Sequence, residues 1–218
     1  MFNDLKLNPM KSEALLIGNR QQMKSAKCDS STVQISVVTV PFSENVELLG
    51  VTFDNTLSFD HHTSDICSNA FFHLKALRHI RCKLDQSTAN SIASSFVASR
   101  LDYCNAILAG MSAHNMKQLQ HIQNSAARIV HNSHGRSNIS AMLSKLHWLP
   151  IAQRIDYKIA LTKFKVLTVN QPAYLRCLLH IFKPMRSLRS SSKGVLLNVP
   201  LAKTVSATRA FSSYAPRL

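Results

Sequence analysis

The chain has 218 residues, of which 45% are hydrophobic and 17% are charged. This length and apolar content can form a folded core and exclude a wholly disordered protein. The formal net charge of +15 is unevenly distributed, because residues 1–102 contain ten Lys and Arg against ten Asp and Glu, whereas residues 103–218 contain sixteen against one. Clustered positive charge attracts phosphates, so the second half predicts nucleic acid as a partner. The alternatives are a basic surface that is only solvated, or one that pairs with acidic segments outside this chain.

Cysteine usage and hydropathy indicate the compartment. The five cysteines are widely spaced and include no Cys-x-x-Cys pair, which is typical of reduced, intracellular proteins. The first residues, with Asp4 and Pro9, do not form a signal peptide pattern, and no apolar run of ~18 residues indicates a membrane span. We therefore predict an intracellular protein, nuclear or cytoplasmic, without a membrane partner.

The N-terminal part of the chain predicts β-structure. Residues 13–18, 33–40 and 46–53 are apolar, or alternate apolar with polar residues, and each is expected to be one strand. Three strands without further partner strands leave unpaired edges. We therefore expect the first 55 residues to be the least stable part.

From about residue 60, apolar residues recur every three or four positions, which predicts helices. Six are expected: from about residue 60, after Asp85 or Ser87, after Ser112, after Ser137, from Pro150 to residue 170, and over 173–182. The second is expected to end at Gly110 and to bury Ala89, Ile92, Phe96, Tyr103 and Ile107. The third is expected to carry Met116, Leu119, Gln123, Ala126 and Val130 on one side, and the fifth is expected to bury Ile151, Ile155, Ile159, Val166 and Val169. Residues 183–218 are basic and rich in serine, which predicts a flexible tail with a strand-like patch at 195–199.

Five short motifs stand out along the chain. They are Leu5-Lys-Leu-Asn8 followed by Lys11-Ser-Glu13, Leu48-Leu-Gly-Val51, Ser99-Arg-Leu-Asp-Tyr-Cys-Asn105, Leu119-Gln-His-Ile-Gln-Asn-Ser-Ala-Ala-Arg128, and Leu146-His-Trp-Leu-Pro-Ile151. In this order and over nearly the whole chain, they resemble the C-terminal part of the reverse transcriptase of LINE-type non-LTR retrotransposons. The resemblance implies a mainly α fold with three domains. Residues 1–57 would be the end of the palm, with three strands and a hairpin at 48–51 that holds the primer, residues 58–182 a helical thumb and connector of five to six helices, and residues 183–218 the flexible tail.

The catalytic centre of such a polymerase is missing from this sequence. Phosphoryl transfer by two metal ions needs adjacent carboxylates that hold the ions about 3.5 to 4 Å apart, and the chain contains no Asp-Asp pair. The resemblance implies that the parent enzyme would need magnesium, but we expect no cofactor and no catalytic residue in this chain, and both ends look cut. Lys11 matches a palm lysine thought to protonate pyrophosphate, and here its expected role is vestigial or that of an exposed lysine.

The fifth predicted helix carries the candidate nucleic-acid contacts. Arg154, Lys158 and Lys165 fall within about 40° of one another at 100° per residue, and Tyr157 and Phe164 flank them. Basic side chains there would contact phosphates of RNA or an RNA–DNA duplex, and an aromatic ring could stack on a base. The alternative is an ordinary amphipathic helix whose aromatic residues belong to the core. Arg100 and Arg128 are expected to pair with Asp102 or to cap a helix.

The ten histidines lack the spacing of a zinc site, so we expect no bound metal. Two interpretations of the function stay open. The expected function is that of a truncated reverse transcriptase that binds nucleic acid without extending it. The alternative is a stand-alone helical module, from a co-opted or decayed retroelement, that binds a protein partner.

Overall fold

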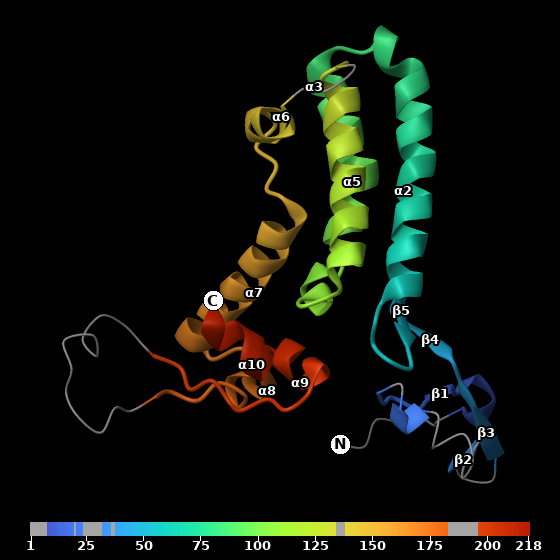
Figure 1. The fold of residues 1–218 in the computed structure, drawn as a ribbon, viewed down its shortest axis with the longest axis vertical. Helices are drawn as coiled ribbons and strands as arrows, with labels where there is room; N and C mark the ends of the chain where they lie inside the picture. Colours follow the sequence, from blue (N-terminus) through green and yellow to red (C-terminus); the bar gives the residue numbers. More distant parts are fainter. Residues whose placement is uncertain (1–7, 20, 24–31, 36–37, 134–137, 183–195) are drawn as a thin grey trace. The chain divides into compact units, whose positions relative to one another are not determined.

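The computed structural model describes residues 8–19, 21–23, 32–35, 38–133, 138–182 and 196–218 (Figure 1). The chain divides into two compact units, Met1–Ser68 and Asn69–Leu218. Five short strands lie in the first unit, and most of the helices lie in the second. The predicted fold class, mainly α with a short N-terminal β part, is confirmed.

The first unit contains five strands where the sequence predicted three. They are β1 (Ala14–Leu15), β2 (Thr32–Ile35), β3 (Val38–Ser43), β4 (Asn45–Leu48) and β5 (Val51–Asp54). In one sheet β3 lies between β1, to which it is parallel, and β2, to which it is antiparallel. The second sheet is the β4–β5 hairpin.

Two of the predicted single strands are therefore wrong, because each folds back on itself. Residues 33–40 pair internally, with Val33 opposite Val40. Residues 46–53 turn at Leu49 and Gly50, whose φ angles of 51° and 74° suit the two-residue turn of a tight hairpin. A turn of only two residues hardly interrupts the apolar pattern of the sequence, so the pattern did not reveal it. The hairpin expected at 48–51 from the family resemblance is present.

A buried aspartate organises the loop between β5 and the first long helix. The Asp54 side chain is 6% exposed and accepts hydrogen bonds from the backbone N–H groups of Thr56, Ser58 and Phe59 at 3.0, 2.9 and 2.6 Å. The hydroxyl of Thr56 donates a further bond at 2.7 Å. Burial alone would raise the pKa of Asp54, but the bonds from Ser58, Thr56 and Phe59 hold this pKa below its ordinary value of 3.8.

We expect Asp54→Asn to lower the free energy of unfolding of the first unit by about 1–3 kcal/mol, because the charge-assisted bonds to Ser58 and Phe59 are lost. Since the folded-state pKa is depressed, the wild-type contribution is present above 3.8 and is lost as the pH falls through the lower folded value. Calorimetry between about pH 2 and 6 measures both effects. The matched control is Glu47→Gln, which removes one exposed negative charge from β4. Equal destabilisation by both variants would contradict the assigned role.

The helices of the chain follow in sequence order. They are α2 (Asp60–Ile80), α3 (Gln86–Ala93), α4 (Ser99–Asp102), α5 (Ala113–Val130), α6 (Ile139–Lys145), α7 (Ile151–Val169), α8 (Ala173–Arg176), α9 (Val205–Arg209) and α10 (Phe211–Tyr214). Single 3-10 turns are η1 (Pro9–Lys11), η2 (Arg81–Lys83), η4 (Asn105–Leu108) and η6 (Ala215–Arg217), and η3 (Ser94–Ala98) is a π-helical turn. Of the two candidate caps of the second predicted helix, Asp85 is the observed one and accepts a bond from the N–H of Thr88. The third helix begins after Ser112 as expected, and Ser112 caps it by accepting a bond from the N–H of Asn115. Ser137 lies outside the described residues, and Asn138 caps α6.

The predicted second helix is not continuous. It divides into α3, η3, α4 and η4, because the π-helical turn changes the helical phase and Cys104 has a φ of 49°. The buried face is Ala89, Ala93, Val97 and Leu101, whereas Phe96, Tyr103 and Ile107, which we expected inside, are exposed. The wider turn and the break after α4 redirect these side chains.

The core of the second unit is built around α5. Leu119, Ile122, Gln123, Ala126 and Val130 of this helix are at most 1% exposed. Helix α5 packs against α3, α6 and α7, and it lies beside α2 (Figure 1). The ring of Phe71 on α2 lies 6.0 Å from that of His121 on α5. The regular apolar spacing of α5 explains why its buried face was predicted correctly. On α7 the expected core residues are buried except Val169, which lies exposed in the last turn.

The C-terminal residues correct the prediction of a flexible tail. Residues 196–218 include α9, α10 and η6, and η6 packs against α7. The Tyr214 hydroxyl donates a 2.8 Å hydrogen bond to Asp156 of α7, and burial together with this carboxylate raises the pKa of Tyr214 to about 12. Part of the predicted patch at 195–199 forms one antiparallel bridge, between Leu197 and Ile181, so α8 is shorter than the helix expected over 173–182. Residues 183–195 lie outside the described residues.

Candidate nucleic-acid interface

Helix α7 carries a basic and aromatic surface. Its buried side is formed by Ile151, Ile155, Ile159 and Val166. Lys158 and Lys165 are exposed, as are the rings of Tyr157 and Phe164, at 60% and 62%. The two rings therefore do not belong to the core, contrary to the alternative interpretation of this helix. We call Tyr157, Lys158, Phe164 and Lys165 the α7 ridge.

Arg154 is less available than the two lysines. Its Nη2 atom lies 2.7 Å from Oδ2 of Asp102 on α4, and its side chain is 20% exposed. Burial raises the pKa of Asp102, and the positive charges of Arg154 and Lys158 and a bond from Asn105 oppose this rise. The ion pair joins α7 to α4 and offsets much of the charge that Arg154 would present to a phosphate.

The expected pairing of Arg100 or Arg128 with Asp102 is wrong. The side chain of Arg100 lies 3.1 Å from Nε2 of His73 on α2. Arg128 lies at the C-terminal end of α5. Arg154 takes the place beside Asp102, although 52 positions separate the two residues.

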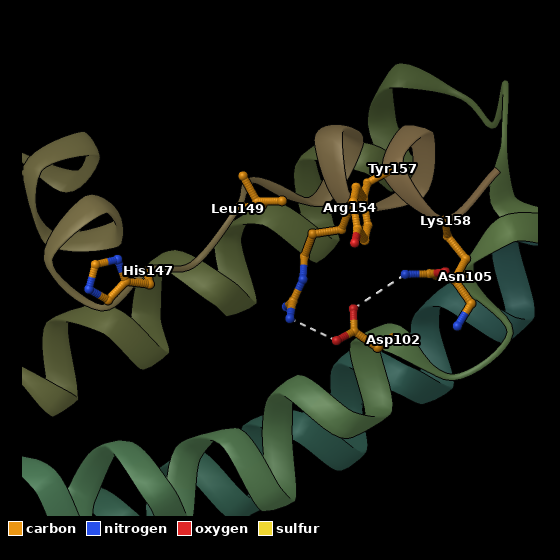
Figure 2. A pocket seen from close by; sticks show the side chains of 7 residues that line it. All are labelled: Asp102, Asn105, His147, Leu149, Arg154, Tyr157 and Lys158. Atoms are coloured by element: carbon orange, nitrogen blue, oxygen red, sulfur yellow. Dashed lines mark hydrogen bonds and ion pairs between the residues drawn. The ribbon is translucent and has the colours of Figure 1, made fainter. Parts of the chain in front are cut away.

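A cavity of about 280 Å³ lies beside the ion pair (Figure 2). It is lined by Asp102, Asn105, His147, Leu149, Arg154, Tyr157 and Lys158. Figure 2 shows Arg154 and Asn105 both directed at Asp102, with Tyr157 and Lys158 on the same helix as Arg154. The cavity therefore adjoins the α7 ridge.

Two buried polar atoms near this cavity have no hydrogen-bond partner among the residues that the structure describes. They are Oδ1 of Asn105, a residue that is 4% exposed, and Nη1 of Arg154. The Nδ2 atom of Asn105 donates a hydrogen bond to Oδ1 of Asp102 at 3.3 Å. Because both atoms are buried, a water molecule inside the protein is the kind of partner that could bind this acceptor and this donor.

Three sequence motifs far apart along the chain build this site. The segment 99–105 supplies Asp102 and Asn105. From the segment 119–128, Gln123 donates a 2.8 Å bond to the carbonyl of Leu149, and Gln120 accepts a 3.0 Å bond from the N–H of Ile151. The two glutamines thus fix the segment 146–151 at the start of α7. The amide of Gln123, buried on an otherwise apolar helix face, is the signal whose role sequence reasoning missed.

The only acidic residue after position 102 does not neutralise the ridge by a direct contact. Asp156 accepts the hydrogen bond from Tyr214 on the C-terminal helix α10. The ammonium groups of Lys158 and Lys165 have no hydrogen bond or ion pair within the described part of the chain, although Lys158 lies close enough to Asp102 to affect its pKa. Both lysines can therefore contact a ligand.

Lys11, the candidate palm lysine, lies in the first unit rather than at this site. It ends the 3-10 turn η1, and it is exposed. Within the described residues, no group of three His, Cys, Asp or Glu side chains could hold a metal ion. None of the described helices has the length and apolar character needed to cross a bilayer.

No protein-family model, curated protein or solved structure matches this chain. The candidate function therefore has to follow from the side chains of α7 and from the motifs that surround it. These comprise two free lysines, two exposed rings, and a polar cavity at the base of the ridge.

Proposed function

We propose that the second unit binds the backbone of RNA or of an RNA–DNA duplex through the α7 ridge. The observation that carries this proposal is the exposure of Lys158 and Lys165 beside the exposed rings of Tyr157 and Phe164. Ammonium groups neutralise phosphates and release condensed counterions, whereas exposed rings offer a stacking surface for an unpaired base or a sugar. Binding of this kind depends little on base sequence, because phosphates carry no sequence information.

We also propose that the chain derives from the end of a LINE-type reverse transcriptase, with residues 58–182 as its thumb and connector. The meeting of segments 99–105, 119–128 and 146–151 at one site supports this origin, because the residues that carry the resemblance are also those that hold α7 in place. The sequence has no adjacent aspartates to hold the magnesium of the parent enzyme. The proposed activity is therefore binding without strand extension.

The test is the fluorescence anisotropy of a labelled RNA–DNA primer-template at about 50 and about 200 mM salt. If two to three phosphates are contacted, a slope of about −0.9 per contact predicts a loss of affinity of roughly 10- to 40-fold over this range. The full chain is used, because η6 and Tyr214 contact α7 and removal of the C-terminal residues would expose this part of the helix. Affinity that is absent, or that does not change with salt, would contradict the proposal.

A second candidate function rests on another exposed feature. The ring of His73 stacks on that of Phe96 at 5.3 Å and meets the edge of Phe72 at 5.5 Å, and Phe72 is 72% exposed. Exposed aromatic clusters favour protein interfaces. This interpretation predicts concentration-dependent association or partner binding that Phe72→Ser abolishes, with no salt-sensitive affinity for the duplex. Sedimentation velocity of the chain and of this variant measures the self-association.

A further inference from the structure

A second basic cavity lies in the same unit, at the end of α5. Its volume is about 370 Å³, and it is lined by Arg78, Arg81, Cys82, Arg128, Ile129, Asn132 and Ser133. Three of these seven residues are arginines and none is acidic. None of them lines the cavity beside Asp102.

All three nitrogens of the Arg81 guanidinium donate hydrogen bonds to backbone carbonyls of the protein. Its guanidinium donates to the carbonyls of Ile129, Val130 and Leu84, with distances of 2.9 Å to Ile129, 2.7 Å to Val130 and 2.7 Å to Leu84. The last carbonyls of a helix carry partial negative charge that would repel an anion. Arg81 covers these carbonyls and so removes the main obstacle to an anion in the cavity.

The turn that ends α5 is closed as well. The N–H of Ser133 donates to the carbonyl of Arg128 at 3.0 Å, and that of Asn132 donates to the carbonyl of Ile129 at 2.9 Å. Asn132 takes a φ of 48°, as the residue after a helix commonly does. The backbone near Arg128 is therefore ordered without any ligand.

Arg78 and Arg128 differ from Arg81, because their guanidinium groups make no hydrogen bond within the described residues. Within the described residues, neither guanidinium has a hydrogen bond or a carboxylate partner, and Arg128 is only half-exposed. They come from α2 and α5, two helices held together here by Arg81. Arg128 thus places a partly buried cation, and Arg78 an exposed one, at the lining of the same cavity, where an anion that neutralises both is favourable.

We infer that this cavity is a binding site for a phosphate group, with Arg78 and Arg128 as its ligating residues and Arg81 as a positioning residue. The planar guanidinium suits the oxygens of a phosphate in a two-point contact. The volume accommodates a phosphate together with several waters, since each water occupies about 30 Å³. The phosphate could be a free ion or a phosphodiester of a nucleic acid strand. The inference does not depend on the α7 ridge, which shares no residue with this cavity.

The test compares Arg78→Gln/Arg128→Gln with Lys75→Gln/Lys83→Gln. Both variants remove two positive charges, and the two control lysines are exposed residues of α2 and η2 outside the cavity lining. Thermal unfolding of the full chain is followed with rising inorganic phosphate, against chloride at equal ionic strength. Anisotropy with the RNA–DNA duplex is measured for the same proteins. Circular dichroism confirms that each variant is folded.

Three outcomes decide the inference. Saturable stabilisation by inorganic phosphate that only the arginine variant loses supports a site for the free ion. No such stabilisation, but a duplex affinity at least roughly tenfold lower in the arginine variant than in the lysine variant, supports a phosphodiester site. No phosphate effect together with equal duplex affinities of the two variants overturns it. This last result leaves the α7 ridge untouched, because all four ridge residues are intact in both variants.

Discussion

Replacing both Lys158 and Lys165 with glutamate is expected to lower the affinity for an RNA–DNA duplex by at least about 100-fold at low salt. Each lysine would lose a charge-assisted contact worth about 1.5–3 kcal/mol, and each new carboxylate would repel the backbone. Both side chains are exposed and make no hydrogen bond or ion pair within the described part of the protein, although Lys158 lies near Asp102, so the helix content should be kept. Fluorescence anisotropy measures the affinity, and far-UV circular dichroism checks the helix content.

A charge-matched control separates a site from general basicity. Lys117→Glu/Lys145→Glu changes the net charge by the same amount on exposed positions of α5 and α6. If the ridge is the interface, this control weakens binding far less than the α7 variant does. The milder Lys158→Gln/Lys165→Gln variant is expected to reduce the salt slope by about two, one for each lost phosphate contact. Equal effects of the two glutamate variants would show that the chain binds only as a polycation.

Arg81→Met is expected to have the largest effect on stability, lowering the free energy of unfolding by about 2–4 kcal/mol. The substitution keeps an unbranched apolar side chain of similar length, but it removes the Arg81 donor from the carbonyls of Val130 and Leu84 and leaves that of Ile129 with backbone bonds alone, such as the one from Asn132. It also removes the positive charge at the C-terminal end of α5, where such a charge is favourable. Urea unfolding followed by the fluorescence of Trp148, the single tryptophan of the chain, measures the change.

Lys83→Met serves as the control for this prediction. Lys83 is an exposed basic residue of the same short turn, η2, with no side-chain hydrogen bond within the described residues. Loss of a surface charge alone should change the stability by less than about 0.5 kcal/mol. If Arg81→Met is no more destabilising than Lys83→Met, the guanidinium does not hold α2 and α5 together.

The elements predicted best were those with a long, regular pattern. The core face of α5 and the caps Asp85 and Ser112 follow from spacing and from residues within one helical turn. The prediction failed where a short local feature changed the phase. The turn at Leu49 and Gly50 occupies two residues and reverses the direction of a strand. The π-helical turn η3 occupies five residues and changes which side chains of the helix face the core.

The candidate site was predicted in part. Sequence spacing grouped Arg154, Lys158 and Lys165 with Tyr157 on one face of α7, and the structure leaves the two lysines and the ring exposed. Sequence spacing could not reveal that Asp102 pairs with Arg154, or that Gln120 and Gln123 hold the start of α7. The cavity lined by Arg78 and Arg128 was missed altogether, since its residues come from separate helices.

By itself, the sequence determined the mainly helical character, the charge asymmetry and the basic face of α7, because composition and periodicity depend only on neighbouring residues. Only the tertiary structure decided which charges remain free. Asp102 forms an ion pair with Arg154, carbonyls of α5 accept hydrogen bonds from Arg81, and Asp156 accepts a hydrogen bond from the hydroxyl of Tyr214. Tertiary structure also decided that residues 196–218 include short helices, of which α10 and η6 contact α7. Such pairings join residues tens of positions apart, and they form only where packing brings the elements together.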